Sequence, residues 1–228
     1  MDAPLPISSH YLGDAGEHYS SVYQRDADLP GYRYDAAFFA PHLRPDDVLL
    51  DFGCGNGGLL RRLAPFVKRA DGLEVNPASA AIARESGLHV AGGLDALEPG
   101  TYTVILTNHV LEHVRDVPTT LERLRTLLVP GGRLVVRLPI DDPHARKQRS
   151  WSRDDIDRHL QTWTPRLFAN LLYETGFEVD DARVYASAWH PKLFWLERFG
   201  LHRIAFWAVA VAFRRRQLFV RAHRPSEP

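Results

Sequence analysis

The sequence predicts an α/β fold in which helices cover both faces of a mainly parallel sheet. Short apolar runs typical of buried strands recur along the chain, and stretches with apolar side chains at helical spacing separate most of them. Strands that alternate with helices form right-handed crossovers and therefore pair in parallel. The chain has 228 residues, of which 45% are hydrophobic, so we expect one domain with a sizeable core.

The first half of the chain alternates regularly between the two kinds of element. Its opening residues are polar and aromatic, which indicates a cap of loop and helix, and Pro45 ends the short amphipathic helix that follows. Pro77 suits the first turn of a later helix. In chain order, the expected elements are the cap at 1–30, a helix at 33–43, a strand at 48–51, a helix with Leu59, Leu60, Leu63 and Phe66 on its apolar face, a strand at 69–73, a helix at 77–86 and a strand at 88–91.

The second half contains a charged excursion at 141–158, which we expect to cross the carboxyl edge of the sheet. Thr164 and Pro165 mark the start of a helix as its N-cap and first residue. In chain order, the expected elements are a strand at 102–107, a helix with Val117, Leu121, Leu124 and Leu128 on one face and Pro130-Gly131-Gly132 at its end, a strand at 134–138, a helix with the stripe Leu167, Phe168, Leu171 and Leu172, a strand at 177–187, one or two helices over 191–213 with Gly200 as the break, and a strand at 216–223.

A glycine-rich loop follows the first strand, in the stretch "VLLDFGCGNGG" at 48–58. Glycines here let the backbone approach a ligand and adopt positive φ, and a helix beginning near Gly58 would direct its N–H groups to the same place. The spacing of Gly53, Gly55 and Gly58 fits the dinucleotide fingerprint. The spacing of Gly53, Gly55 and Gly57 behind Asp51 fits a loop that binds S-adenosylmethionine. By itself the loop does not choose between these cofactors.

Polar residues follow the other predicted strands at the same edge of the sheet. Glu74 can accept hydrogen bonds from both hydroxyls of an adenosine ribose, and Asp95 can accept one from an adenine amino group. Asn108 and His109 would face the reacting end of the cofactor or the acceptor. His109 and His113 are four residues apart, but there is no H-E-x-x-H pattern and no third ligand with suitable spacing, so we expect no metal.

Charge and cysteine content narrow the class of protein. The 28 basic and 28 acidic side chains balance, and no basic stripe indicates a nucleic-acid partner. Cys54 is the single cysteine, so no internal disulfide can form. The first residues do not resemble a signal peptide, and the most apolar segment, at 192–216, has charge-free runs too short for a membrane span. We therefore expect a cytoplasmic protein.

Five segments together resemble the class I S-adenosylmethionine-dependent methyltransferases. They span roughly residues 45–185 and read "VLLDFGCGNGGLL", "DGLEVNPASAAIAR", "YTVILTNHVLEHVRDV", "LVPGGRLVVRLP" and "HLQTWTPRLFANLLYETGFEV". A dehydrogenase would not be expected to carry the Leu-Glu-His and Pro-Gly-Gly segments. The resemblance implies a Rossmann-like seven-stranded sheet in the order 3-2-1-4-5-7-6, with strand 7 antiparallel, and S-adenosyl-L-methionine as the cofactor.

The resemblance also implies roles for single residues. It sets the methionine end of the cofactor against Asp51 and the loop residues Gly53, Cys54, Gly55 and Gly57. It assigns the ribose to Glu74, the adenine to the neighbourhood of Val75 and Asp95, and the amino-acid end to Asn108. Within one domain, residues 1–45 would be an N-terminal helical cap, 46–139 the cofactor-binding core, and 140–228 the acceptor side with the last strands and an aromatic-rich helix.

The acceptor and the general base are less closely defined by the sequence. Transfer to an alcohol or phenol needs a base, and the candidates at the strand ends and on the excursion are His109, His113, Asp141, Asp142, His144 and His159. We expect His109 or His159 to border the acceptor, with Trp163 in the wall, and His113 to orient a loop. We expect the roof of the pocket to come from residues 1–35, 140–162 and 188–205, and their Tyr, Trp, His and Arg favour O-methylation of a small sugar-like or aromatic metabolite.

Three alternative functions remain open at this point: a methyltransferase for a lipid-linked acceptor, a nucleotide-binding oxidoreductase and an inactive cofactor-binding regulator. The first depends on residues 191–213, which are followed by "RRR". These residues would contact a membrane in that case, and would otherwise cover the sheet or form a homodimer interface.

Overall fold

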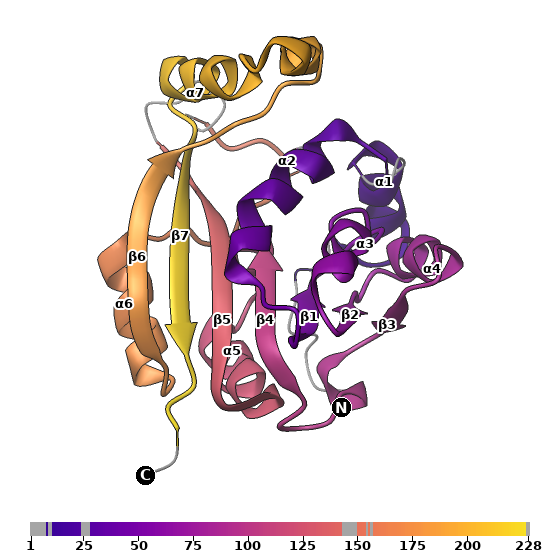
Figure 1. The fold of residues 1–228 in the computed structure, drawn as a ribbon, viewed down its shortest axis with the longest axis vertical. Coiled ribbons are helices and arrows are strands. Elements are labelled where there is room, and N and C mark those ends of the chain that lie inside the picture. Colours follow the sequence, from indigo (N-terminus) through magenta and orange to yellow (C-terminus); the bar gives the residue numbers. More distant parts are fainter. Residues whose placement is uncertain are drawn as a thin grey trace.

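A computed structural model gives the structure of the chain, and it describes residues 8, 11–23, 28–142, 150–153, 155 and 157–226. The predicted base candidate His144 lies outside these residues. Within them, a seven-stranded sheet has the order β3-β2-β1-β4-β5-β7-β6 (Figure 1). Strand β7 runs antiparallel to both of its neighbours, β5 and β6, and the remaining pairs are parallel. The predicted topology is therefore confirmed.

The elements follow the predicted alternation closely. In chain order they are α1 (Gly13–Tyr23), α2 (Pro30–Phe39), η2 (Ala40–His42), β1 (Val48–Phe52), α3 (Leu60–Leu63), η3 (Ala64–Phe66), β2 (Arg69–Leu73), α4 (Pro77–Glu85), β3 (His89–Ala91), η4 (Leu94–Ala96), β4 (Tyr102–Asn108), η5 (Leu111–His113), α5 (Val117–Leu127), β5 (Leu128–Ile140), α6 (Pro165–Glu174), β6 (Glu178–Ala186), η7 (Pro191–Phe199), α7 (His202–Ala212) and β7 (Arg216–His223), where η marks a 3₁₀ helix.

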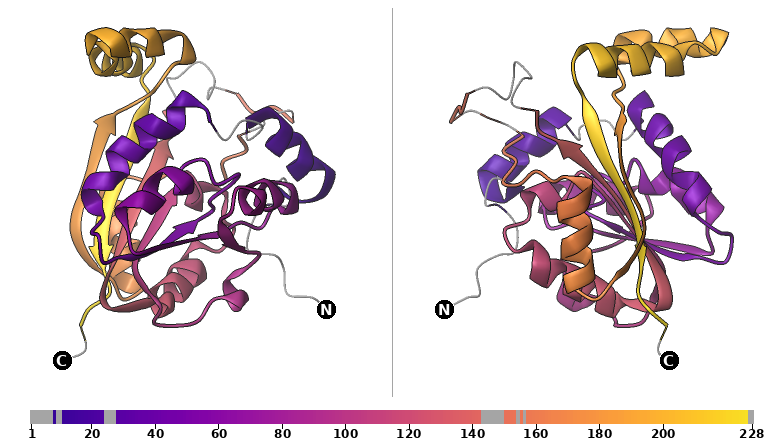
Figure 2. Two further views of the ribbon diagram at one scale, coloured as in Figure 1. Left: turned by 45° about the vertical axis from the view of Figure 1, so that its right-hand side comes forward. Right: turned by 90° about the vertical axis from the view of Figure 1, so that its left-hand side faces the viewer.

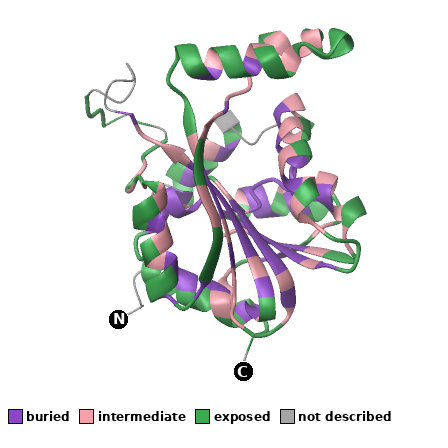
Figure 3. Cartoon of the chain, turned by 60° about the vertical axis from the view of Figure 1, so that its left-hand side comes forward, coloured by how far each residue is buried: buried purple, intermediate pink, exposed green. Residues whose placement is uncertain are grey.

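Two layers of helix bury the two faces of the sheet (Figure 2). On one face, Leu121 of α5 and Phe168 of α6 pack with Ile105 and other strand residues. On the opposite face, Phe39 of α2 and Leu63 of α3 pack with strand residues of the other parity. Because side chains alternate along a strand, each central strand contributes to both cores, and the middle of the sheet is fully buried (Figure 3).

Three sequence predictions need correction. Leu128 begins β5 instead of ending the helix, because it pairs with Tyr102 of β4. The register of the two strands then shifts, and the Pro-Gly-Gly segment lies within this shift. The helix after the glycine loop is a single α-turn that passes into a 3₁₀ turn, because Pro65 has no N–H to continue the α-helical bonds. Leu167 of the predicted apolar stripe is exposed, whereas Phe168 and Leu172 are fully buried.

The last two helices form an arm beyond the carboxyl edge of the parallel strands (Figure 1). Gly200, with φ +69°, separates η7 from α7, which confirms the predicted break. We call residues 191–213 the η7–α7 arm. Among the described helices, none combines the length and the apolar character needed to cross a membrane.

Candidate functional site

The predicted site residues converge at the carboxyl edge of the central strands. Strand β1 pairs with β2 on one side and with β4 on the other, so that Phe52 lies beside Leu73 and Thr107. The next residues along these strands are Gly53, Glu74 and Asn108. Ligands of open α/β sheets bind at this edge, where the strand order reverses.

Close packing and positive φ fix the glycine loop. Gly53 has φ +79°, and a Cβ at this position would lie 2.4 Å from a methyl group of Val110. Gly57 has φ +77°, and its Cβ would lie 2.4 Å from a methyl group of Leu88. Gly55, with φ +56°, also has the predicted positive value. Helix α3 starts at Leu60, two residues after the predicted start near Gly58, and is one turn long. The N–H groups of the loop donate within the protein: those of Gly53 and Cys54 to the Leu73 carbonyl, that of Gly55 to Glu74 and that of Gly57 to the Cys54 carbonyl.

A buried carboxylate and a partly buried one stand at the entrance of this loop. Asp51 is 2% exposed, and burial together with the nearby charge of Glu74 raises its pKa to about 7. Burial also raises the pKa of Glu74, and backbone N–H groups oppose this shift. The Glu74 carboxylate accepts hydrogen bonds from the N–H of Gly55 at 2.9 Å and of Asn76 at 2.7 Å. A cationic ligand would therefore relieve the unfavourable burial of this negative pair.

The remaining predicted cofactor residues occupy different environments. The Cys54 thiol is buried against Gly72 in the core, so only its backbone faces the loop. Val75 packs on the edge of the opposite core. The Asp95 side chain is 93% exposed and forms an ion pair with Arg123 at 2.5 Å. An adenine contact from Asp95 would require this pair to open.

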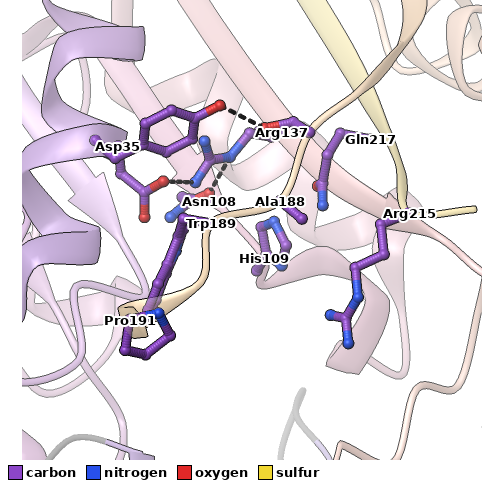
Figure 4. Close-up of a pocket in the computed structure, with 11 residues that line it drawn as sticks. Asp35, Asn108, His109, Arg137, Ala188, Trp189, Pro191, Arg215 and Gln217 are labelled. Atoms are coloured by element: carbon purple, nitrogen blue, oxygen red, sulfur yellow. Dashed lines mark hydrogen bonds and ion pairs between the residues drawn. The ribbon is translucent and has the colours of Figure 1, made fainter. Parts of the chain in front are cut away.

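A buried ionic network lies beside the end of β4. Arg137 of β5 forms an ion pair with Asp35 of α2 at 2.6 Å, and its Nε donates to the Asn108 side-chain oxygen at 2.7 Å (Figure 4). The guanidinium also lies over the rings of Phe38 and Phe39, at 5.2 and 5.1 Å from their centroids. These contacts fix the position of Asn108 and attach helix α2 to the sheet.

This network forms one wall of a cavity of about 490 Å³ (Figure 4). The lining residues come from α2, from the ends of β4 and β5, and from the segments that flank the arm. They are Tyr34, Asp35, Asn108, His109, Arg137, Ser187, Ala188, Trp189, Pro191, Arg215 and Gln217. The Oε1 atom of Gln217 is buried and has no hydrogen-bond partner among the described residues. The cavity is therefore suited to a ligand that carries a hydrogen-bond donor.

His109 contributes an imidazole to this cavity from a constrained backbone. Its φ of +57° is unusual for a residue other than glycine, and its N–H donates to the Arg137 carbonyl at 2.9 Å. Desolvation and the positive charge of Arg137 lower the pKa of His109. The side chain keeps 38% of its surface exposed. At neutral pH the imidazole is thus uncharged and accessible.

A second polar cluster lies directly beneath His109. The Glu112 carboxylate is 1% exposed, 4.0 Å from His109 Nδ1 and 3.8 Å from His113 Nε2. Neither of its oxygens has a hydrogen-bond partner among the described residues, and burial raises the pKa of Glu112 to about 8. Each of Glu112, His113 and His159 offers one potential ligand atom within 4.8 Å of the others. The expectation that the protein uses no metal stays a prediction.

His113 and His159 have partners outside the cavity. The Tyr11 hydroxyl lies 2.8 Å from His113 Nδ1, so His113 joins the N-terminal cap to the core. His159 Nδ1 lies 3.0 Å from Asp141, and although burial opposes it, this carboxylate raises the pKa of His159. Asp142 pairs with Arg214 at 2.7 Å. Neither His159 nor the two aspartates line the cavity.

Some of the cavity was unexpected from the sequence. Trp163, predicted in the wall, packs instead on the core and on Phe168, at 5.3 Å between ring centroids. Asp35 and Trp189 lie in two of the segments expected to form the roof, although neither was named individually, and sequence reasoning missed Arg137 and Gln217. Of these, Arg137 alone carried a signal, because it is a single charge inside the apolar strand "LVVRLP".

Comparisons with known proteins agree with this geometry. The family described as "Methyltransferase domain" matches residues 23–182 of the chain. The ubiquinone biosynthesis O-methyltransferase of Paraburkholderia xenovorans is 36% identical over 95 residues, which are 37% of this chain and 41% of that protein. The chain therefore matches well under half of the length of this curated relative.

Solved structures share the fold at low identity. The phosphoethanolamine N-methyltransferase 2 of Haemonchus contortus, in complex with S-adenosyl-L-methionine, has a TM-score of 0.67 and 15% identity over 96% of this chain and 58% of that chain. A chain from the complex of the Haloferax volcanii Trm112 methyltransferase activator with a methyltransferase has a TM-score of 0.64 and 18% identity over 90% of this chain and 96% of that chain. At these identities the similarity concerns the fold.

Proposed function

We propose a small hydroxylated acceptor for this chain, which belongs to the S-adenosylmethionine-dependent methyltransferase family. The product would be an O-methyl ether of a sugar-like or aromatic metabolite. Family membership replaces the dinucleotide-binding alternative that the glycine spacing had left open, and S-adenosyl-L-methionine is the cofactor. The observation that carries the choice of acceptor is the polar cavity beside Asn108 and His109.

The residues at the loop fit this cofactor. When bound, its sulfonium supplies an activated methyl group, and the protein then has to orient the acceptor. Asp51 would hold the cationic methionine end, with the backbone of Gly53, Cys54, Gly55 and Gly57 around it. Glu74 would accept from the ribose hydroxyls, Val75 and Asp95 would border the adenine, and Asn108 would lie beside the amino-acid end.

The cavity suits a flat ring that carries hydroxyl groups. Tyr34 and Trp189 contribute aromatic surface, whereas Asp35, Arg215 and Gln217 contribute polar groups. The Gln217 side chain interacts with His109, whose pKa it raises, and its Oε1 could also accept a hydrogen bond from such a hydroxyl. The division into a cap at 1–45, a cofactor-binding core at 46–139 and an acceptor side at 140–228 stays a proposal, and all three parts contribute residues to the cavity.

We assign the general base to His109. It lines the cavity and is uncharged at neutral pH, because desolvation and Arg137 lower its pKa to about 3. A base this weak needs a neighbouring negative charge to accept the proton of a hydroxyl. Glu112, 4.0 Å from Nδ1, would supply that charge once it loses its own proton, since burial raises its pKa to about 8. His159 lies outside the cavity, and we propose that it acts on catalysis only by positioning this cluster.

Labelled methyl transfer to a panel of sugars, phenols and amines tests the proposal. We expect transfer to hydroxyl compounds and a decrease in kcat of about 100-fold in His109→Asn, with unchanged affinity for S-adenosylhomocysteine. Asparagine is chosen because it tolerates the positive φ. His159→Ala should lose less. Transfer to amines alone, or unchanged turnover in both variants, would contradict the assignment, and tight cofactor binding without any transfer would favour an inactive regulator.

A lipid-linked acceptor is the second candidate. It is favoured by one observation, namely that Trp189, Pro191 and Arg215 line the cavity at the two ends of the η7–α7 arm, whose outer surface is apolar. A panel that includes hydroxylated isoprenoid-linked compounds in detergent separates the two candidates.

A further inference from the structure

Helix α7 is apolar around nearly its whole circumference, yet only one side of it is covered. Phe206 and Ala210 are buried, and Phe206 packs against Tyr34 and Phe194 at 5.2 and 5.0 Å between ring centroids. The opposite side presents Ile204, Trp207 and Val211, which recur at positions i, i+3 and i+7. A helix with apolar residues on all sides is normally buried on all sides, so this outer face requires an explanation.

The exposed apolar surface continues beyond α7. The arm presents seven large apolar side chains, each 49–67% exposed: Trp195, Phe199, Leu201, Ile204, Trp207, Val211 and Phe213. None of these side chains is buried by the rest of the described structure, and we call these seven side chains the outer face of the arm.

Basic residues outnumber acidic ones within the arm and directly after it. Residues 191–216 contain one acid, Glu197, and six cations: Lys192, Arg198, Arg203, Arg214, Arg215 and Arg216. The acid is paired with Arg33 of α2 at 3.0 Å, and Arg214 is paired with Asp142 at 2.7 Å. The guanidinium of Arg198 lies over the Phe199 ring, at 4.5 Å from its centroid. Apolar and positive groups are therefore mixed on one surface.

We propose that the η7–α7 arm docks on an anionic membrane surface, with the outer face in the lipid and the arginines against the head groups. Tryptophan side chains favour this boundary, and each nearby Lys or Arg adds attraction to anionic lipid. A two-fold contact between copies of the chain would instead bring the same excess of cations on each copy together, which costs free energy. The charge thus favours lipid over a second copy.

The position of the arm gives this docking a consequence for the site. The arm stands beyond the carboxyl edge of the parallel strands, the edge that carries the glycine loop (Figure 1). Trp189 and Pro191 precede or begin the arm and Arg215 follows it, and all three line the acceptor cavity. Helix α7 has 11 residues, about 16 Å, so it would lie in the membrane interface without crossing it. Docking would bring the cavity close to the lipid surface.

Sedimentation of the full chain with vesicles tests the proposal without any methyl acceptor, so its failure is separate from failure of the proposed function. The vesicles are phosphatidylcholine alone or with about one-third phosphatidylglycerol. We expect binding to the anionic vesicles that weakens at high salt. The double variant Ile204→Ser/Trp207→Ser should need about tenfold more lipid or more for half-maximal binding, because it removes two anchors. Both side chains are exposed, so its thermal unfolding should resemble that of the wild type.

Matched variants on α6 provide the controls. Leu167→Ser/Tyr173→Ser also replaces two exposed apolar residues, and Arg166→Glu serves as the charge control for Arg203→Glu. The α6 variants should bind like the wild type, and Arg203→Glu should bind more weakly. Wild-type protein that stays in the supernatant with both vesicles would overturn the proposal. Equal loss in the α6 and arm variants would also overturn it, as would a dimer in solution that the arm variant abolishes without any vesicle binding.

Discussion

Asp51 links folding stability to cofactor binding, and the two should respond in opposite directions to Asp51→Asn. Burial and the neighbouring Glu74 raise the pKa of Asp51 from 3.8 to about 7 in the folded protein without ligand. The folded state therefore binds a proton more tightly than the unfolded chain, and stability falls as the pH rises from about 4 to about 7. An asparagine at this position removes that penalty.

The pKa displacement sets the size of the effect. A change from 3.8 to about 7 corresponds to about 4 kcal/mol, at 1.36 kcal/mol per pKa unit. We expect about 2 kcal/mol of added stability at pH 8, since a buried amide has its own unmet hydrogen-bonding needs. Below pH 4 the gain should vanish. Affinity for S-adenosylhomocysteine should fall about 10- to 100-fold, because a charged hydrogen bond to the ligand ammonium is lost.

Chemical denaturation at several pH values and calorimetric titration measure the two effects. In the wild type, affinity for S-adenosylhomocysteine should rise with pH up to about 7, as Asp51 ionises, and the asparagine variant should lack this dependence. A variant that is less stable than the wild type at pH 8 and binds the ligand equally well would refute the reasoning.

Three further predictions follow from buried contacts. Gly53→Ala should lower the free energy of unfolding by about 1–3 kcal/mol, because its Cβ would meet Val110 at 2.4 Å. The control Gly92→Ala, with open space around it, should change little, and equal denaturation curves for the two variants would contradict the prediction. Arg137→Met should lower the free energy of unfolding by about 3–5 kcal/mol, because it leaves Asp35 buried and unpaired. The double variant Arg137→Met/Asp35→Asn should recover part of this loss, and wild-type stability of the single variant would contradict the prediction. Dialysis against EDTA should leave methyl transfer unchanged, and a loss restored by Zn²⁺ would instead assign a metal to Glu112, His113 and His159.

Local signals in the sequence were sufficient for most of the fold. Strand β7 agrees with its predicted bounds at 216–223, and α6 begins at Pro165 with Thr164 as its N-cap, because alternation and capping are encoded by neighbouring residues. The start of β5 at Leu128 was missed, since it depends on pairing with Tyr102 across the sheet. The exposed side of α7 was also unpredictable, because periodicity cannot reveal which side of an apolar helix is covered.

The residues of the site also differ in how well the sequence predicts them. Asp51, Glu74 and Asn108 could be placed together because each lies at or next to the end of a strand, and parallel strands end at one edge. The segments of Asp35 and Trp189 were expected in the roof, but these two residues could not be singled out, because only tertiary packing decides which side chains of α2 and of the connection before the arm lie beside β4. His109 and His159 had equal support from sequence, and the structure distinguishes them by lining the cavity with His109 alone.

A crystal structure with S-adenosylhomocysteine bound tests the central claim most directly. The account predicts the ligand ammonium beside Asp51, the ribose hydroxyls on Glu74, and the sulfur directed toward the cavity that Asn108 and His109 line. A ligand whose sulfur points away from this cavity, or that binds at another edge of the sheet, would contradict it.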